Sequence, residues 1–109
     1  MWGDGSAVRD YLYIDDAVSA CVQLIDASQA TGPFNAGSGI STSIAELTAL
    51  VGKITGRDLE IVQRPARGTD VRAIVLHSAR LSRATGWKAL TDLELGLQRT
   101  WAWLGKTGA

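Results

Sequence analysis

The stretch that begins at Gly3 constrains the fold of this chain more than any other. Gly-Asp-Gly breaks the chain into a turn. The alternating tyrosines that start at Tyr11 are typical of a β-strand, and Asp15 or Asp16 can cap a helix that follows. The stretch therefore predicts a turn, a short strand and a helix. Arg9 lies where the turn becomes strand, a position at which a rigid scaffold can hold a guanidinium toward a ligand.

Composition limits the classes of protein that the chain can belong to. Its 109 residues, 46% of them hydrophobic, suit one small domain. Eleven basic and eleven acidic residues cancel, so bulk charge favours neither nucleic acid nor an anionic membrane as a partner. The single cysteine excludes an internal disulfide and a cysteine-rich zinc site. Neither a secretory signal nor an apolar run of membrane-spanning length is visible, so a cytoplasmic setting is expected.

The first helix is predicted over residues 16–27. Val18, Cys21, Val22 and Ile25 recur at helical spacing and give the segment one apolar face. We expect that face to be buried, and Cys21 with it as an inert core thiol.

Three further helices have start or stop signals. Ser-x-x-Glu at 43–46 is a capping box, and Gly56 suits the end of the helix that it opens. Thr91 to Glu94 repeats the pattern at the start of the last helix, and residues 78–85 form a shorter helix that Gly86 stops. Trp87 and Trp101 are predicted to pack in the core.

Short strands are predicted at 34–36 and 59–64, with an extended piece at 73–76 and a loop at 65–70. The chain thus has about four helices and three to four short strands. The alternation of strands and helices predicts an α/β fold.

Two loops carry candidate binding residues. Arg9 follows the first turn, and Arg67 and Asp70 lie in the loop 65–70. Two guanidinium groups on separate loops can clamp a diphosphate, and the Asp70 carboxylate can accept from sugar or base hydroxyls. The alternative, favoured by the residue pattern alone, is that Arg9 pairs with Asp10 or another carboxylate and that Arg67 is solvated.

No catalytic or metal site is predicted. His77 is the only histidine, and its neighbour Ser78 does not lie in a nucleophile-elbow motif. One histidine and scattered carboxylates do not supply a metal's ligands. Asp15 and Asp16 are interpreted as helix-start residues because the helix dipole favours negative charge there.

Five motifs in order resemble one known family. They are Gly-Asp-Gly-x-x-x-Arg-Asp-Tyr-x-Tyr-Ile-Asp-Asp-Ala, Gly-Pro-Phe-Asn-x-Gly-Ser-Gly, Ser-x-x-Glu-Leu, Pro-x-Arg-x-x-Asp and Thr-Gly-Trp-Lys, followed by a tryptophan-rich last helix. The chain resembles the extended short-chain dehydrogenase/reductases, and within them the NAD-dependent epimerase/dehydratases of the UDP-glucose 4-epimerase type. The resemblance covers nearly all 109 residues and corresponds to the C-terminal third of such an enzyme.

This resemblance implies a function for the loops. Residues 1–109 would form a single substrate-binding lobe for a nucleotide sugar, with a UDP-sugar favoured. Arg9 and Arg67 would bind the diphosphate, Asp70 would help hold the nucleoside, and Trp2 would belong to the segment that lines the base pocket. Tyr11 is also assigned to the substrate site.

The resemblance also implies which functions this chain lacks by itself. The glycine-rich NAD turn and the Tyr-x-x-x-Lys pair of the family's Rossmann part do not occur in this sequence, so we expect no catalysis and no cofactor bound by this chain alone. NAD would belong to the full-length family. His77 replaces an aspartate common in the family, with Ser78 expected to cap the next helix instead, and Ile74 replaces a substrate-contacting tyrosine of some epimerases.

Two hypotheses for the whole chain follow. It is the nucleotide-sugar-binding part of an epimerase/dehydratase, or it is a stand-alone binding or interaction module that keeps the fold without the chemistry. In the full enzyme, residues 16–27 and 34–36 would lie against the Rossmann sheet. Without that sheet their apolar surface is exposed, so we expect self-association or a separate Rossmann partner.

Overall fold

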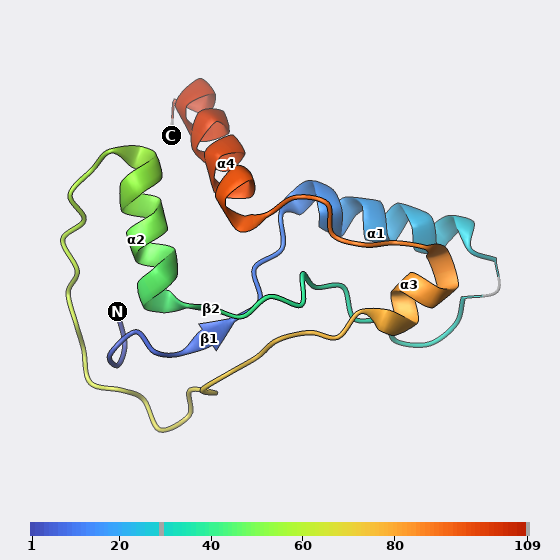
Figure 1. The fold of residues 1–109 in the computed structure, drawn as a ribbon, viewed down its shortest axis with the longest axis horizontal. Coiled ribbons are helices and arrows are strands. Elements are labelled where there is room, and N and C mark those ends of the chain that lie inside the picture. The colour runs from blue at the N-terminus through green and yellow to red at the C-terminus, as the bar shows by residue number, and fades with distance from the viewer. Residues whose placement is uncertain (29, 109) are drawn as a thin grey trace.

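The computed structural model describes residues 1–28 and 30–108 (Figure 1). Its elements in chain order are β1 (Val8–Arg9), α1 (Ile14–Asp26), β2 (Thr42–Ser43), α2 (Ile44–Thr55), α3 (Ala79–Thr85) and α4 (Leu93–Thr107). β1 and β2 pair antiparallel, with Val8 opposite Ser43. The predicted α/β class and the four helices are confirmed, but the sheet holds only these two short strands within the described residues.

α2 begins and ends as its sequence predicts. The Ser43 hydroxyl accepts a hydrogen bond from the Glu46 amide at 3.1 Å, and the Glu46 carboxylate accepts from the Ser43 amide at 2.7 Å. These two bonds satisfy donors that a helix start leaves unpaired. Gly56 ends the helix with a φ of +65°, a conformation that glycine adopts without strain.

α1 starts two residues earlier than predicted and buries the opposite face. Tyr13 is its N-cap, without a side-chain hydrogen bond, so the predicted capping by Asp15 or Asp16 is wrong. The side chain of Asp16 is instead buried and accepts from the Thr91 amide at 2.9 Å. Asp16 and Ala20 face the protein, while Cys21 is exposed, so its predicted burial is also wrong.

The starts of α3 and α4 differ from prediction in their side-chain contacts. Asp92, not Thr91, caps α4, because its carboxylate accepts from the Leu95 amide at 2.8 Å. Ser78 is the N-cap residue of α3, but its side chain makes no capping hydrogen bond. Its hydroxyl instead accepts from the Gly37 amide at 2.9 Å and donates to the Gly37 carbonyl at 3.1 Å.

The strands predicted at 34–36 and 59–64 are absent from the described structure. Both segments are extended but lack strand neighbours, apart from one isolated bridge between Trp2 and Arg64. Ala73 likewise forms a single bridge with Val8. Strand formation needs a hydrogen-bonding partner, and the described chain offers none beside these segments.

The hydrophobic core is very small. Ala20, Leu81 and Trp87 are its buried members, and Leu12, Leu24, Phe34, Ala36 and Ala89 pack partly against them. The Trp87 indole N–H donates to the Asp16 carbonyl at 3.0 Å and to the Ser19 hydroxyl at 2.9 Å. The predicted burial of Trp87 is confirmed, whereas Trp101 is 36% exposed and lies outside the core.

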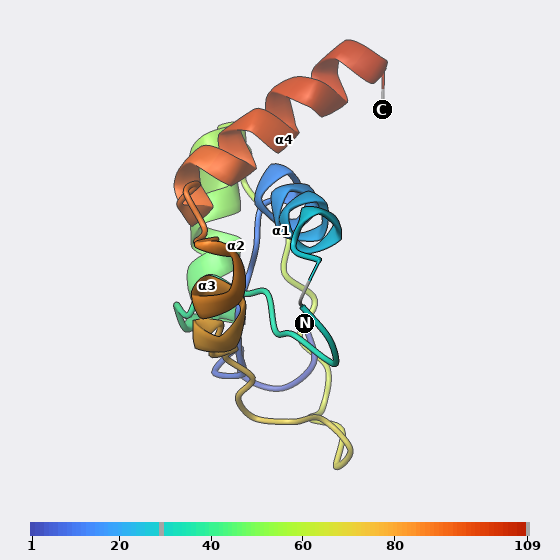
Figure 2. The ribbon, with the colours of Figure 1, turned by 90° about the vertical axis from the view of Figure 1, so that its right-hand side faces the viewer.

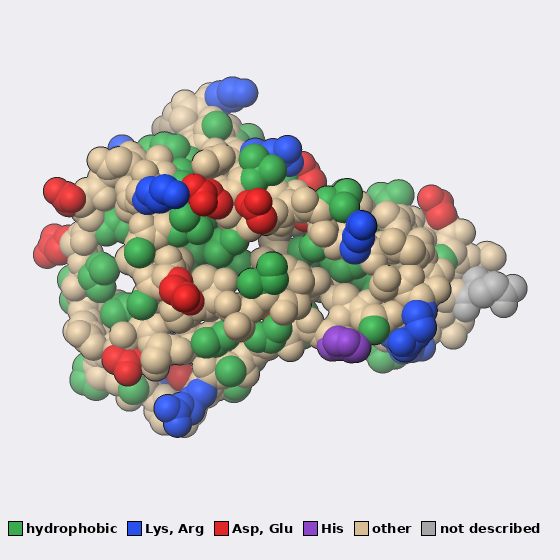
Figure 3. Space-filling model, in the orientation of Figure 1, with side chains coloured by type: hydrophobic (Ala, Val, Ile, Leu, Met, Phe, Trp, Pro, Cys, Tyr) green, Lys and Arg blue, Asp and Glu red, His purple; other side chains and the backbone are tan. Residues whose placement is uncertain are grey.

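The molecule is a thin plate, with extents of 48 × 38 × 18 Å (Figure 2). Its accessible surface is 7684 Å², whereas a self-sufficient monomer of 11.6 kDa exposes about 5,800 Å². Its Cα radius of gyration is 16.3 Å, against about 13 Å for a compact chain of this length. Gaps pass through the plate on the side of α2, with hydrophobic side chains around them (Figure 3). The fold therefore leaves much more surface open than one domain of its mass normally does.

One carboxylate connects distant parts of this plate. Asp10 accepts hydrogen bonds from the Ser38 amide at 2.8 Å, the Ser38 hydroxyl at 2.6 Å, the Gly39 amide at 2.9 Å and the Leu76 amide at 3.1 Å. Gly37 makes room for this contact, because a Cβ there would lie 2.6 Å from the Leu76 Cβ and 2.7 Å from the Asp10 Oδ2. Three chain segments thus meet at Asp10.

The Asp10 contacts predict acid sensitivity. Burial raises the pKa of this carboxyl, but the hydrogen bonds from Ser38, Gly39 and Leu76 outweigh burial, so the pKa lies below its ordinary value. A carboxyl with a lowered pKa stabilises the fold above its unfolded-state pKa and loses that effect as pH falls through the folded-state value. We therefore expect the free energy of unfolding to decrease below about pH 4. Urea titrations between neutral and acidic pH measure it, and a stability that stays flat into that range would contradict this role.

Candidate functional site

The first three residues are hydrogen-bonded to Gln63 and Arg64, which lead into the loop that carries Arg67. The Gly3 amide donates to the Arg64 carbonyl at 2.9 Å, and the Arg64 amide donates to the Met1 carbonyl at 2.8 Å. The Gln63 side-chain amide adds a bond to the Gly3 carbonyl at 3.0 Å. Trp2 is therefore fixed beside Arg64 although 62 positions separate them in sequence.

Trp2 and two arginines form a stacked cluster. The guanidinium carbon of Arg67 lies 4.9 Å from the centroid of the Trp2 ring, and that of Arg64 lies 5.7 Å away. Both distances fall within the range of cation–π attraction. Trp2 is 47% exposed, so the cluster is open to a ligand from solvent.

Asp70 holds the Arg67 guanidinium in this cluster. Arg67 Nε donates to Asp70 Oδ2 at 3.1 Å, and Arg67 Nη2 lies 3.0 Å from Asp70 Oδ1. This two-point pairing orients the planar guanidinium. An anionic ligand that binds Arg67 would meet a cation already positioned by Asp70, and would compete with Asp70 for its donors.

The far end of the same loop is attached to β1. The Val8 amide donates to the Arg72 carbonyl at 2.9 Å, and the Ile74 amide donates to the Val8 carbonyl at 3.0 Å. The loop 65–72 is thus tied at both ends to the first nine residues (Figure 1). Arg9, the next residue of β1, is therefore brought to the same edge of the plate as the loop.

The structure places Arg9 near this edge without joining it to the cluster. Its Nη1 donates to the Val8 carbonyl at 2.8 Å, so the predicted alternative of an Arg9–Asp10 pair does not form. Among the described residues, the Arg9 side chain shares no hydrogen bond, ion pair or ring contact with Trp2, Arg67 or Asp70.

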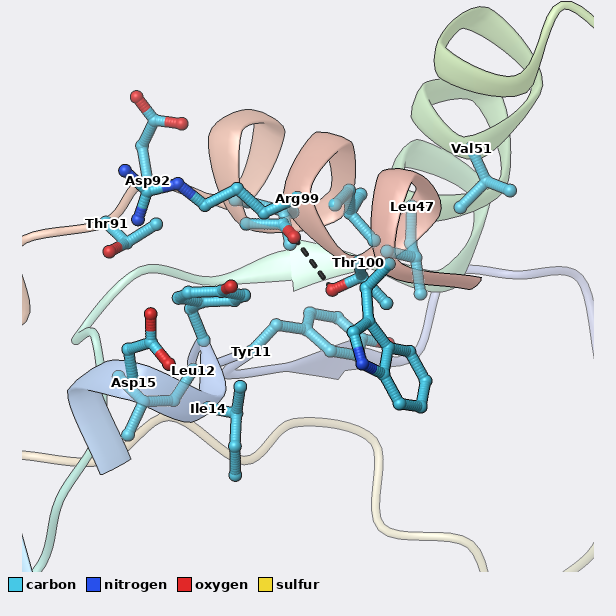
Figure 4. Close-up of a pocket in the computed structure, with 15 residues that line it drawn as sticks. Tyr11, Leu12, Ile14, Asp15, Leu47, Val51, Thr91, Asp92, Arg99 and Thr100 are labelled. Atoms are coloured by element: carbon cyan, nitrogen blue, oxygen red, sulfur yellow. Dashed lines mark hydrogen bonds between the residues drawn. The ribbon is translucent and has the colours of Figure 1, made fainter. Parts of the chain in front are cut away.

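Tyr11 lies elsewhere, in a groove that the sequence did not predict. The groove, of about 790 Å³, runs between the start of α1 and the helices α2 and α4. Figure 4 shows Tyr11 and Ile14 on one side of it, with Leu47 and Arg99 on the other. The Arg99 guanidinium lies 5.7 Å from the centroid of the Tyr13 ring.

Sequence reasoning also missed Arg64 as a partner of Trp2. The spacing Arg64-x-x-Arg67 is a local signal, but only the folded chain shows that both guanidinium groups lie near the Trp2 ring. Within the described residues, no group of three or more His, Cys, Asp and Glu side chains could hold a metal ion. No described helix has the length and apolar character needed to cross a bilayer.

Comparisons with known proteins agree with the motifs of this chain. The profile of the NAD dependent epimerase/dehydratase family matches residues 1–37. The UDP-glucose 4-epimerase of Thermotoga maritima, solved with UDP-glucose, superposes on 100% of this chain with a TM-score of 0.88 and 37% identity. The chain is a region of the NAD-dependent epimerase/dehydratase type. It accounts for 35% of the Thermotoga chain.

Sequence relatives of this epimerase/dehydratase region act on different sugars. A GDP-L-fucose synthase of Sinorhizobium fredii and a UDP-glucose 4-epimerase of Mycolicibacterium smegmatis are each 36% identical to it over 101 residues. These matches cover 93% and 92% of the chain and 32% of each relative. The region thus spans about a third of the length of the curated relatives that it matches, and its likeness to them does not single out one base.

A third match is to an enzyme that was solved with a cofactor bound. The UDP-glucose 4-epimerase of Bifidobacterium longum, solved with NAD⁺ and UDP, has a TM-score of 0.86 and 26% identity over 96% of this chain and 32% of its own. The predicted family is therefore confirmed, and members of the family bind NAD.

Proposed function

We propose that this epimerase/dehydratase region is the C-terminal nucleotide-sugar-binding lobe of such an enzyme and that its substrate is a UDP-sugar. Trp2, Arg67 and Asp70 form the nucleoside and diphosphate end of the site, with Arg9 and Tyr11 as further contacts. The loop 65–72, tied at both ends to the residues that carry Trp2 and Arg9, is the observation that carries this proposal. The Thermotoga and Bifidobacterium enzymes, solved with UDP-glucose and with UDP, support the choice of ligand.

The chemistry of the cluster suits a nucleoside diphosphate. A flat, half-exposed indole can stack on a base or ribose, and the two guanidinium groups against it offer planar donors to phosphate oxygens. Asp70 can exchange its bond to Arg67 for one to a ligand hydroxyl when phosphate takes over the guanidinium. Hydride transfer needs groups that belong to the rest of the enzyme, so this region recognises substrate and does not turn it over by itself.

Isothermal titration of the chain with UDP tests the proposal. We expect saturable binding, and we expect Arg67→Ala to weaken it by about 10- to 100-fold, because one charge-assisted contact is worth about 1.5–3 kcal/mol. Arg83→Ala is the matched control, since Arg83 is an exposed arginine on α3 far in sequence from the loop. A folded chain that binds no UDP at millimolar concentration would overturn the proposal, and turnover of a UDP-sugar with NAD would overturn its non-catalytic part.

A further inference from the structure

Arg64 and Arg67 both lie near the Trp2 ring, but among the described residues only Arg67 has an anionic partner. Asp70 pairs with Arg67 through both carboxylate oxygens, at 3.1 Å to Nε and 3.0 Å to Nη2. The Arg64 side chain is exposed and has no hydrogen bond or ion pair within the part of the chain that the structure describes. The two arginines therefore differ in how much of their charge is free for a ligand.

The charges near the Trp2 ring do not balance. The Asp70 carboxylate offsets one of the two guanidinium charges and leaves the other in excess. Two cations beside one ring repel each other, so an approaching anion is attracted most by the guanidinium that has no partner. A phosphate group suits this position, because its oxygens accept charge-assisted hydrogen bonds from planar N–H donors.

Two backbone hydrogen bonds tie Arg64 to the start of the chain. Its amide donates to the Met1 carbonyl at 2.8 Å, and its carbonyl accepts from the Gly3 amide at 2.9 Å. Arg67 is held differently, because its carbonyl accepts from the Asp70 amide at 3.1 Å inside its own loop. The unpaired guanidinium thus extends from an anchored position, whereas the paired one belongs to a loop that can rearrange around a ligand.

We propose that Arg64 supplies the free positive charge that attracts the diphosphate of the nucleotide sugar. Arg67 joins it only when Asp70 exchanges the guanidinium for a ligand hydroxyl. This role rests on the proposed nucleotide-sugar site and gives the two arginines of that site different tasks. Arg64 attracts any phosphate, whereas the pair of Arg67 and Asp70 responds to a ligand that carries both a phosphate and a hydroxyl.

Isothermal titration with UDP and with inorganic pyrophosphate tests the role of Arg64. Arg64→Ala should weaken the binding of both ligands by about tenfold or more, because it removes a charge-assisted contact to phosphate. Arg64→Lys should keep most of the affinity, because lysine restores the charge without the planar fork. The hydrogen bonds at position 64 come from the backbone, so both variants should fold. Arg57→Ala is the matched control, since the Arg57 guanidinium lies 5.1 Å from the ring of a different tryptophan, Trp101.

Asp70→Asn tests the exchange at the second arginine. The variant frees Arg67 from its ion pair, so pyrophosphate should bind several-fold more tightly. UDP should gain less, because an amide oxygen accepts from a ligand hydroxyl more weakly than a carboxylate does. The preference for UDP over pyrophosphate should therefore shrink. An equal change in affinity for both ligands would overturn the exchange.

Different results would overturn the role of Arg64 and the site itself. If UDP binding depends on Arg67 but not on Arg64, the site stands and the role of Arg64 is overturned. If Arg64→Ala weakens only UDP, Arg64 contacts the base, and its role toward phosphate is overturned. If pyrophosphate binding depends on Arg64 while UDP does not bind, the attraction of phosphate by Arg64 stands and the nucleotide-sugar site is overturned. A folded wild type that binds neither ligand would overturn both.

Discussion

Replacing Trp87 by alanine is expected to lower the free energy of unfolding by about 4 kcal/mol. Trp87 is only 2% exposed and is the largest side chain of a buried core that otherwise consists of Ala20 and Leu81. Its indole N–H also joins α1 through the Asp16 carbonyl and the Ser19 hydroxyl. Because the core is so small, its few remaining residues can fill only part of the cavity, so the loss should be a large share of the total stability.

Urea unfolding followed by far-ultraviolet circular dichroism measures this loss, at one protein concentration for all variants. Trp101→Ala is the matched control, because Trp101 is 36% exposed and has a cation–π contact with Arg57 at 5.1 Å. Its removal should cost about 1 kcal/mol. Trp87→Phe should fall between the two, because it keeps an aromatic ring but loses the N–H donor. Equal losses at Trp87 and Trp101 would contradict the small-core description.

The helix ends were predictable because their contacts are local. The capping box of Ser43 and Glu46 spans three residues, and Gly56 needs only its own backbone freedom to end α2. The start of α4 was missed by one residue for a related reason. Thr91 and Asp92 are both good caps, and only the folded chain shows that the Asp92 carboxylate reaches the helix.

Burial was not predictable where it depends on partners. The pattern in α1 identified an apolar face correctly, but Val18, Val22 and Ile25 point outward, and the less apolar side with Asp16 and Ala20 is buried. A hydrophobic period indicates a face that can be covered, but not what covers it. The strand predicted at 59–64 is absent for a similar reason. Alternating apolar and polar residues form a strand only where a neighbouring strand offers hydrogen-bonding partners.

The candidate site was predicted in part. Arg67 and Asp70 lie three positions apart, and their pairing is within reach of sequence reasoning. The stacking of both arginines on Trp2 depends on a contact between residues about 60 positions apart, which only the fold supplies. The resemblance to a family indicated Trp2 as a binding residue, but the sequence contains no local sign that Arg64 lies against it.

Asp10→Asn is expected to lower the free energy of unfolding by about 2–3 kcal/mol. The carboxylate accepts four hydrogen bonds from Ser38, Gly39 and Leu76, which lie 28 to 66 positions away in sequence. An asparagine side chain has one acceptor oxygen and turns an N–H₂ group toward donors that then lose their partner. The loss should shrink as pH falls below about 4, because the wild-type carboxylate becomes protonated as pH passes through its lowered folded-state pKa.

Asp4→Asn is the control for this variant and lies in the same opening stretch. The Asp4 carboxylate also accepts from a serine, with the Ser6 amide at 2.9 Å and the Ser6 hydroxyl at 2.6 Å, but both bonds are exposed and span two residues. Its substitution should therefore change stability much less than that of Asp10. If the two variants proved equally stable, Asp10 would not be the junction of three segments. If only Asp10→Asn is destabilised at neutral pH, then Asp10 has a structural role and holds the loop 37–39 against the chain at Leu76. Its neighbour Arg9 would then be the residue of this pair to test for substrate contacts.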